Sequence, residues 1–210
     1  GERPWAAPRY TIALAATFLF AGAVVGGYAL LPATLVFVLL ILTPSAWSRP
    51  ALLVFVAASL IYLPQLGTYG LWDPWETHYG EVAREILARD DWISLWWAQE
   101  DWFWSKPILI FWMEALAMLS LGVDYLPDAN PLHPEWAIRL PIYAISIAGV
   151  LSAYAAVSRL FGRRAGVLSA LVLATMPYYY MLAHQSITDM PFVGWMTVAV
   201  SLLVLAVTED

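Results

Sequence analysis

The sequence predicts an all-α fold, a polytopic bundle of transmembrane helices with amphipathic juxtamembrane helices in a long first external loop. Composition is the first reason: 61% of the 210 residues are hydrophobic and 12% are charged, which is typical of a membrane protein. The second is a series of apolar runs that approach the length needed to cross a hydrocarbon core of about 30 Å. The third is clustering, since twelve of the sixteen acidic residues and nine of the twelve tryptophans lie within 67–137. Such a segment is expected at a bilayer edge, where it meets a polar substrate.

Charge and cysteine content exclude some classes of function. The chain has no cysteine, which excludes disulfides and thiolate metal sites. Its net charge of −6 argues against a nucleic-acid partner, because nucleic acid favours clustered Lys and Arg. The chain begins GERPW and ends TED directly after an apolar run, so we expect it to be part of a longer polypeptide.

The apolar runs define the expected elements in order. Residues 1–50 are expected to form an extra transmembrane hairpin, built from the runs 10–31 and 33–42. Further spans are predicted at 51–66, 138–160, 165–182 and 191–207, with a tight basic turn at 161–164. Residues 51–210 would then form the main domain.

The run 108–123 is ambiguous, and positive charge decides its placement. Basic residues in short connections between spans stay on the cytoplasmic side. The ones that flank spans are Arg3, Arg9, Arg49, Arg159, Arg163 and Arg164. All six are cytoplasmic only if 108–123 does not cross, so we predict a helix in the outer interface, with Glu114 and Trp112 at head-group level. Residues 67–137 are then one external loop, and 184–190 form a second loop on the same side.

An amphipathic helix is predicted within the first loop. Its apolar face would be formed by Tyr79, Val82, Ala83, Ile86 and Leu87, with Glu81, Arg84 and Glu85 opposite. Asp73 is expected to be the N-cap, Pro74 the first helical residue and Glu76 the partner in a capping box.

Three carboxylates are candidates for chemistry: Asp73, Glu76 and Asp189. Each could also be explained as a helix start. Brought together at the mouth of a helix bundle, they would suit either general-base catalysis or coordination of a divalent cation. Asp73, Glu76 and His184 are the candidate ligands for such a cation, although no HExxH or comparable spacing is present.

Three basic side chains near these carboxylates each have two possible roles. Lys106 would either extend toward the head groups or bind a lipid phosphate as a point charge. Arg84 and Arg139 could share the phosphate, or they could neutralise the surplus of acids, which we favour for Arg84 between Glu81 and Glu85. The tryptophans are typical of a membrane belt and are also compatible with a stacked sugar ring.

Four motifs together resemble a known family. In chain order they read WDPWETHYGEVAREIL, SKPILIFW, RLFGRRAG and TDMPF. Their order and spacing are similar to the amino-terminal half of polyprenyl-phosphate-sugar-dependent glycosyltransferases of the GT-C membrane fold. The likeness covers about residues 51–207 and is greatest to bacterial aminoarabinose transferases acting on lipid A and to protein O-mannosyltransferases.

The resemblance implies roles for individual residues. The family's first external loop carries Asp-Glu followed by a basic residue and Tyr, and here Glu76 and Tyr79 match. Trp75 stands at the aspartate position and His78 at the basic position, so Asp73 is the expected substitute carboxylate. Lys106 matches the lysine near the lipid phosphate, where Arg84, His78 and Tyr79 are expected to assist. Asp189 matches the aspartate of the second external loop.

The implied function is a membrane glycosyltransferase that moves a sugar from an isoprenoid phosphate to an acceptor lipid, glycan or protein, with inversion at the anomeric carbon. The implied location is a bacterial inner membrane, with the active face periplasmic or extracellular. An alternative is a non-catalytic accessory subunit with a transferase-like scaffold, which the Trp75 departure favours. A transporter is less favoured, because transporters place ionisable groups at mid-membrane.

Overall fold

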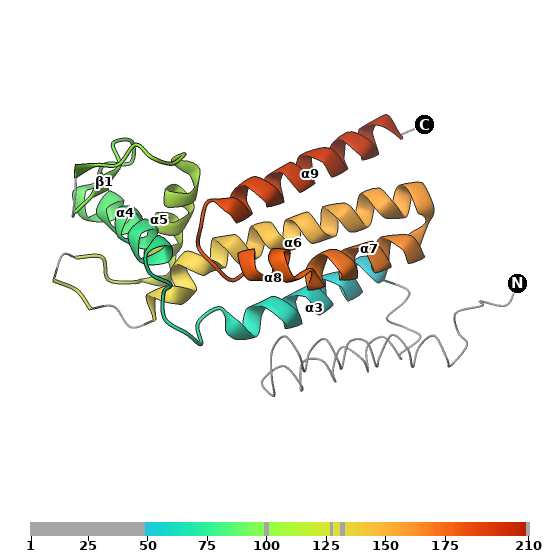
Figure 1. Ribbon diagram of the computed structural model, residues 1–210, viewed down its shortest axis with the longest axis horizontal. Helices are drawn as coiled ribbons and strands as arrows, with labels where there is room; N and C mark the ends of the chain where they lie inside the picture. The colour runs from blue at the N-terminus through green and yellow to red at the C-terminus, as the bar shows by residue number, and fades with distance from the viewer. Residues whose placement is uncertain (1–48, 99–100, 127, 131–132, 209–210) are drawn as a thin grey trace, which may run out of the picture. The chain divides into compact units, whose positions relative to one another are not determined.

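The computed structural model describes residues 49–98, 101–126, 128–130 and 133–208 (Figure 1). The elements of these residues are α3 (Pro50–Tyr62), η3 (Leu63–Gln65), α4 (Trp75–Arg89), β1 (Trp96–Trp97), β2 (Asp101–Trp102), α5 (Leu109–Leu121), α6 (Pro134–Phe161), α7 (Arg163–Thr175), α8 (Pro177–Leu182) and α9 (Asp189–Val207). Helix dominates throughout, which confirms the predicted all-α class. The predicted amino-terminal hairpin, apart from residues 49 and 50, lies outside the described residues.

Contacts divide the chain into two compact units. Among the described residues, the first consists of those within 49–64, 150–176 and 200–208, and the second of those within 65–149 and 177–199. The long helices α6 and α9 pass through both units, whereas α4, α5 and α8 belong to the second. Every candidate site residue named from the sequence lies in the second unit.

Two of the described helices are long and apolar enough to cross a membrane. They are α6, with 28 residues, and α9, with 19 residues, both where spans were predicted. The predicted span at 51–66 is also helical, over Pro50–Gln65, but this apolar helix is shorter than α6 and α9. The chain is a membrane protein whose bundle is shown in part.

The basic turn between α6 and α7 is shorter than predicted. Helix α6 continues to Phe161 and α7 begins at Arg163, so the reversal occurs at Gly162 alone. Gly162 has a φ of 87°, a left-handed conformation that a side chain would strain. The single glycine therefore replaces the predicted four-residue turn at 161–164.

The predicted span at 165–182 is not one continuous helix. The segment is split into α7 and α8 by Pro177, which has no N–H for a helical hydrogen bond. A proline also disfavours the helical conformation in the residue before it, and Met176 is extended with a ψ of 126°. Near this break, within the first unit, the buried Tyr62 hydroxyl donates to the carbonyl oxygen of Ala174 at 3.0 Å. That contact ties α3 to the end of α7.

The amphipathic helix appears as α4, with one correction to its polar face. Tyr79, Val82, Ala83 and Ile86 are buried as predicted. Glu85, expected on the polar face, is only 8% exposed and pairs with Arg84. The helix packs against α5, and the Tyr79 ring of its apolar face meets the Phe111 ring of α5 edge-on.

Asp73 is not the N-cap of this helix. Helix α4 begins at Trp75 with Pro74 at the cap position, and no side chain caps it. The Asp73 carboxylate instead accepts a hydrogen bond from the Thr77 hydroxyl at 2.8 Å. Glu76 does reach back to the preceding chain, but it accepts from the backbone N–H of Trp72 at 2.9 Å.

Helix α5 has one exposed apolar face and one buried face. Leu109, Trp112, Leu116 and Leu119 are exposed along the first face. Glu114, which was predicted at head-group level, lies on the opposite face and is buried within the protein, with no exposed surface. The reason is a buried polar partner contributed by the second loop.

Candidate functional site

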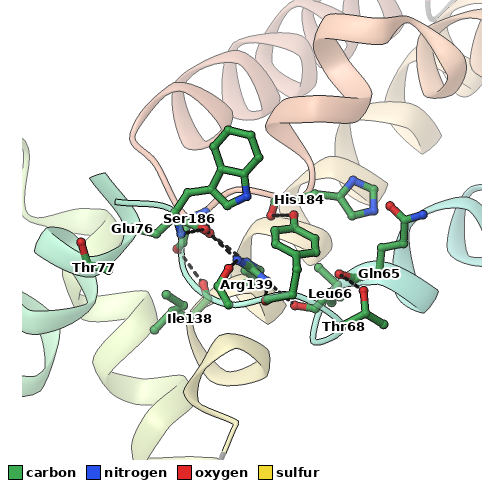
Figure 2. Close-up of polar contacts among 12 residues, drawn as sticks. Gln65, Leu66, Thr68, Glu76, Thr77, Ile138, Arg139, His184 and Ser186 are labelled. Atoms are coloured by element: carbon green, nitrogen blue, oxygen red, sulfur yellow. Dashed lines mark hydrogen bonds and ion pairs between the residues drawn. The ribbon is translucent and has the colours of Figure 1, made fainter. Parts of the chain in front are cut away.

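The second unit is organised around a buried ion pair between Arg139 of α6 and Glu76 of α4 (Figure 2). Both side chains have 0% exposure. The guanidinium binds the carboxylate at two points, Nε to Oε1 at 2.8 Å and Nη2 to Oε2 at 2.7 Å. Such a two-point pairing is the strongest geometry available to Arg and a carboxylate.

The remaining donors of Arg139 hold the segment between α3 and α4. Nη1 donates to the carbonyl oxygens of Leu66 at 2.8 Å and Tyr69 at 3.0 Å, and Nη2 donates to that of Gly70 at 2.9 Å. With the two bonds to Glu76, all five N–H donors of the guanidinium are used. The cation also lies over the Tyr69 ring, 4.1 Å from its centroid.

Glu76 is equally saturated. Oε1 accepts from Arg139 and from the backbone N–H of Ser186 at 2.7 Å, and Oε2 accepts from Arg139 and from the N–H of Trp72. A carboxylate has about four lone-pair positions, and all four are occupied. Glu76 therefore joins α4, α6 and the second loop, and it has no acceptor left for a substrate proton.

Ser186 connects this pair to Glu114. Its hydroxyl lies 2.8 Å from the carbonyl oxygen of Ile138 and also contacts Oε1 of Glu114. Ser186, Glu114 and Glu76 all have 0% exposure. Burial raises the pKa of Glu114 to about 8, with the Ser186 hydrogen bond lowering it and the charge of Glu76 raising it further.

Tyr69 and His184 form a second link between the two loops. The Tyr69 hydroxyl donates to the backbone carbonyl of His184 at 2.8 Å. The His184 ring contacts the carbonyl oxygen of Tyr180 through Nδ1 at 2.8 Å. Burial raises the pKa of Tyr69, while the nearby positive charge of Arg139 lowers it. The predicted meeting of the two loops is confirmed by these contacts and by the bond from Ser186 to Glu76.

Asp189 is the exposed carboxylate on the second-loop side of this meeting point. It begins α9, three residues after Ser186. Burial raises the pKa of Tyr79, the negative charge of Asp189 raises it further, and a hydrogen bond to the Thr188 side chain lowers it. Tyr79 of the first loop and Asp189 of the second are thus neighbours.

The other candidates are spread around this core. Lys106 precedes α5, is exposed, and has no hydrogen bond or ion pair to another described residue. His78 stacks on Trp97 with ring centroids 3.8 Å apart. Arg84 contacts Glu81 through Nε at 2.8 Å and Nη2 at 2.7 Å, and it also pairs with Glu85. Arg84 is thereby committed to its neighbouring acids, the reading favoured from the sequence.

Comparison with known proteins assigns the family. The dolichyl-phosphate-mannose-protein mannosyltransferase family matches residues 105–210, which is half of the chain. The chain belongs to this family. The matched region contains Lys106, Arg139 and Asp189, whereas Glu76 and Asp73 lie before it.

Bacterial relatives extend this result. An undecaprenyl phosphate-α-4-amino-4-deoxy-L-arabinose arabinosyl transferase of Pectobacterium carotovorum is 28% identical over 147 residues, 70% of the chain and 24% of the relative. A protein of that name from Pseudomonas fluorescens is 30% identical over 165 residues, 78% of the chain and 27% of the relative. The chain thus spans about a quarter of the length of these relatives. No solved structure matches it.

The three residues predicted as cation ligands, Asp73, Glu76 and His184, are not arranged to bind one ion together. All lone pairs of Glu76 are taken by Arg139 and backbone N–H groups. Among the described residues, no group of three His, Asp or Glu side chains is placed to hold a metal. A divalent cation at Asp73, Glu76 and His184 would require the central ion pair to break.

Sequence reasoning missed the partners that organise the site. Ser186 was not singled out, and Arg139 was considered as a phosphate ligand or as a counter-charge for the surplus of acids, but not as the partner of Glu76. The available signal was the isolation of Glu114 and Arg139, two charges in apolar helices, since a charge in such a helix requires a buried partner.

Proposed function

We propose that the chain is the amino-terminal part of a membrane glycosyltransferase that moves a sugar from a polyprenyl phosphate donor to an acceptor. The family match, which includes Lys106 and Asp189, carries this proposal. The names of the bacterial relatives support an undecaprenyl phosphate donor. A bacterial inner membrane, with the site on the periplasmic face, is the proposed location.

Asp189 is the proposed general base. It is exposed at the start of α9, beside Tyr79, and the loop before it is fixed by Ser186. The acceptor hydroxyl or amine attacks the anomeric carbon, the bond from that carbon to the phosphate oxygen breaks, and the acceptor proton passes to the Asp189 carboxylate. A single displacement of this kind inverts the anomeric carbon and releases polyprenyl phosphate.

Lys106 is the proposed phosphate ligand. Its ammonium is exposed and uncommitted among the described residues, so it can stabilise the negative charge that develops on the leaving phosphate. His78 and Tyr79 are proposed to line the same region from α4. Arg84 is assigned to its acidic neighbours Glu81 and Glu85.

The remaining carboxylates receive different roles in the proposal. Asp73 is exposed beside α4 and is the candidate for a second base or an acceptor contact. Glu76 acts through Arg139 as a positioning residue, because its lone pairs are occupied. Whether transfer needs a divalent cation is tested by adding EDTA and then Mg²⁺. Loss of transfer in EDTA and its recovery with Mg²⁺ would show that a cation binds at ligands other than the set Asp73, Glu76 and His184.

The test uses the full-length protein in liposomes. Radiolabelled undecaprenyl phosphate-linked 4-amino-4-deoxy-L-arabinose or mannose is supplied, and label is followed into the lipid and protein fractions of added bacterial membranes.

Asp189→Asn is expected to lower kcat on the order of 100-fold or more, the usual contribution of a general base. Lys106→Ala is expected to raise KM for the donor, with partial recovery in Lys106→Arg. Asp124→Asn, an exposed carboxylate in the same outer segment, is the matched control. Unimpaired transfer by Asp189→Asn would remove the mechanism.

An accessory subunit is the alternative function: the family match and the names of the relatives favour the transferase, and the alternative rests on Trp75 alone. Trp75 stands where the family has an aspartate, and its side chain is 57% exposed. Wild-type protein would then give no transfer with either donor and would copurify with a stable partner. Appearance of transfer only in Trp75→Asp would identify a scaffold that lost its first carboxylate.

A further inference from the structure

We propose that Glu114 and Ser186 form a latch that fixes the second outer loop and thereby positions Asp189. Glu114 acts through Ser186 and is a positioning residue. The consequence for catalysis rests on the proposed transferase function, whereas the latch itself is a property of the fold.

The first argument is that three elements hold one residue of the loop. The backbone N–H of Ser186 donates to Glu76 of α4 at 2.7 Å. The Ser186 hydroxyl lies 2.8 Å from the carbonyl oxygen of Ile138 in α6 and contacts Glu114 of α5. Asp189 follows three residues later, so the position of its carboxylate depends on how Ser186 is held.

The second argument is a count of protons. A serine hydroxyl has one proton, yet the Ser186 hydroxyl has two oxygen neighbours that could accept it. Both contacts are hydrogen bonds only if the hydroxyl donates to Ile138 and a protonated Glu114 donates to the hydroxyl. An ionised Glu114, with no exposed surface and a single neutral donor, would also be costly to bury. Glu114 is therefore a hydrogen-bond donor in the latch.

The charges around the latch agree with this protonation. The negative charge of Glu76 on α4 disfavours an ionised Glu114. The positive charge of Arg139 on α6 is already engaged by Glu76 at two points. The titratable residues on the side of the second loop are His184, in the connection between α8 and α9, and Asp189, the first residue of α9.

The absence of cysteine from the chain allows a direct test of loop fixation. Ile187→Cys is introduced into the full-length protein, with any cysteines outside this chain replaced, and its reaction with a maleimide is timed. Glu114→Leu, which removes the donor, is expected to increase the labelling rate about tenfold. Glu114→Gln retains an N–H donor of the same shape and is expected to leave the rate within about twofold. Ser120→Ala is the control on α5, because that hydroxyl bonds only to its own helix.

Transfer kinetics provide the second readout. Glu114→Leu is expected to lower kcat about tenfold with little change in KM for the donor. The separate variant Glu114→Gln is expected to keep kcat close to that of the wild type. If Glu114→Leu does not fold, Ser186→Ala takes its place, since the backbone bond to Glu76 remains. Unchanged labelling in both variants would overturn the latch. If the labelling rates change as expected but the wild type transfers no sugar, the latch stands and only the proposed function is overturned.

Discussion

Arg139 shows how one residue can determine the position of two loops. A buried ion pair stabilises a fold only when every donor and acceptor is satisfied, because the two charges lose their hydration. Arg139 and Glu76 meet this condition with five hydrogen bonds from the guanidinium and four to the carboxylate. Removing one member leaves a buried charge without a partner, which costs more than the pair contributes.

Glu76→Ala should therefore be strongly destabilising. We expect a loss of about 3–5 kcal/mol in free energy of unfolding, measured by SDS titration of the protein in mixed micelles. Glu81→Ala is the matched control, because Glu81 pairs with Arg84 at a partly exposed position and should cost about 1 kcal/mol or less. Equal losses in the two variants would show that Glu76 does not neutralise a buried Arg139.

The raised pKa of Glu114 should make the folded protein less stable as the pH rises. Burial raises its pKa from 4.5 to about 8, so the folded protein retains a proton that the unfolded chain releases. The stability due to this proton is fully present below pH 4.5 and is lost as the pH rises through about 8. The difference in Tm between wild type and Glu114→Gln, measured in detergent from pH 5 to 9, should shift steadily in favour of the variant. Parallel curves would contradict a buried, protonated Glu114.

The residues of the site differ in how far the sequence predicts them. Asp189, Lys106 and Glu76 are recognisable because each lies in a short local motif. Ser186 and Glu76 are separated by 110 residues, and Arg139 and Glu76 by 63. Pairing over such distances depends on how helices pack, which no local pattern contains. The sequence therefore indicates residues within local motifs better than the distant partners that position them.

At the scale of elements, hydrophobic runs predict helices well and their interruptions poorly. The run 165–182 contains no charged residue, yet Pro177 divides it because the ring removes one N–H and favours an extended Met176. Helix α5 illustrates a different limit. Its apolar run suggested that Glu114 would turn toward the head groups, but the partner Ser186 stabilises the opposite orientation.

Close packing of α6 and α7 gives a prediction for Gly166. A Cβ added there would lie 1.9 Å from the Ser158 hydroxyl and 2.8 Å from the carbonyl oxygen of Tyr154. Gly166→Ala must push the helices apart and should cost about 1–3 kcal/mol, seen as a lower Tm in detergent. Gly70→Ala is the control, because no atom lies within 4 Å of its added Cβ. A wild-type Tm for Gly166→Ala would show that α6 and α7 are not in such close contact.

At the scale of the whole molecule, the topology depends on whether α5 crosses the membrane. Its 13 residues extend roughly 20 Å at about 1.5 Å per residue, short of a hydrocarbon core of about 30 Å. It also packs against α4, and its exposed face is apolar, as expected for a helix lying in the interface. The indole N–H of Trp112 donates to the carbonyl of Trp92 at 2.6 Å, which further ties α5 to the preceding loop.

An interfacial α5 places both of its flanks on one side of the membrane, together with Asp189. Single cysteines at Asp91 and Asp124, exposed or partly exposed positions before and after α5, should both react with a membrane-impermeant maleimide applied outside intact cells. A cysteine at Gly162, in the basic turn between α6 and α7, should react only after permeabilisation, because Arg159, Arg163 and Arg164 favour the cytoplasmic side. Labelling of the Asp124 position only after permeabilisation would mean that α5 crosses. The two outer loops would then face opposite compartments, which their contacts at Glu76 and Ser186 do not allow.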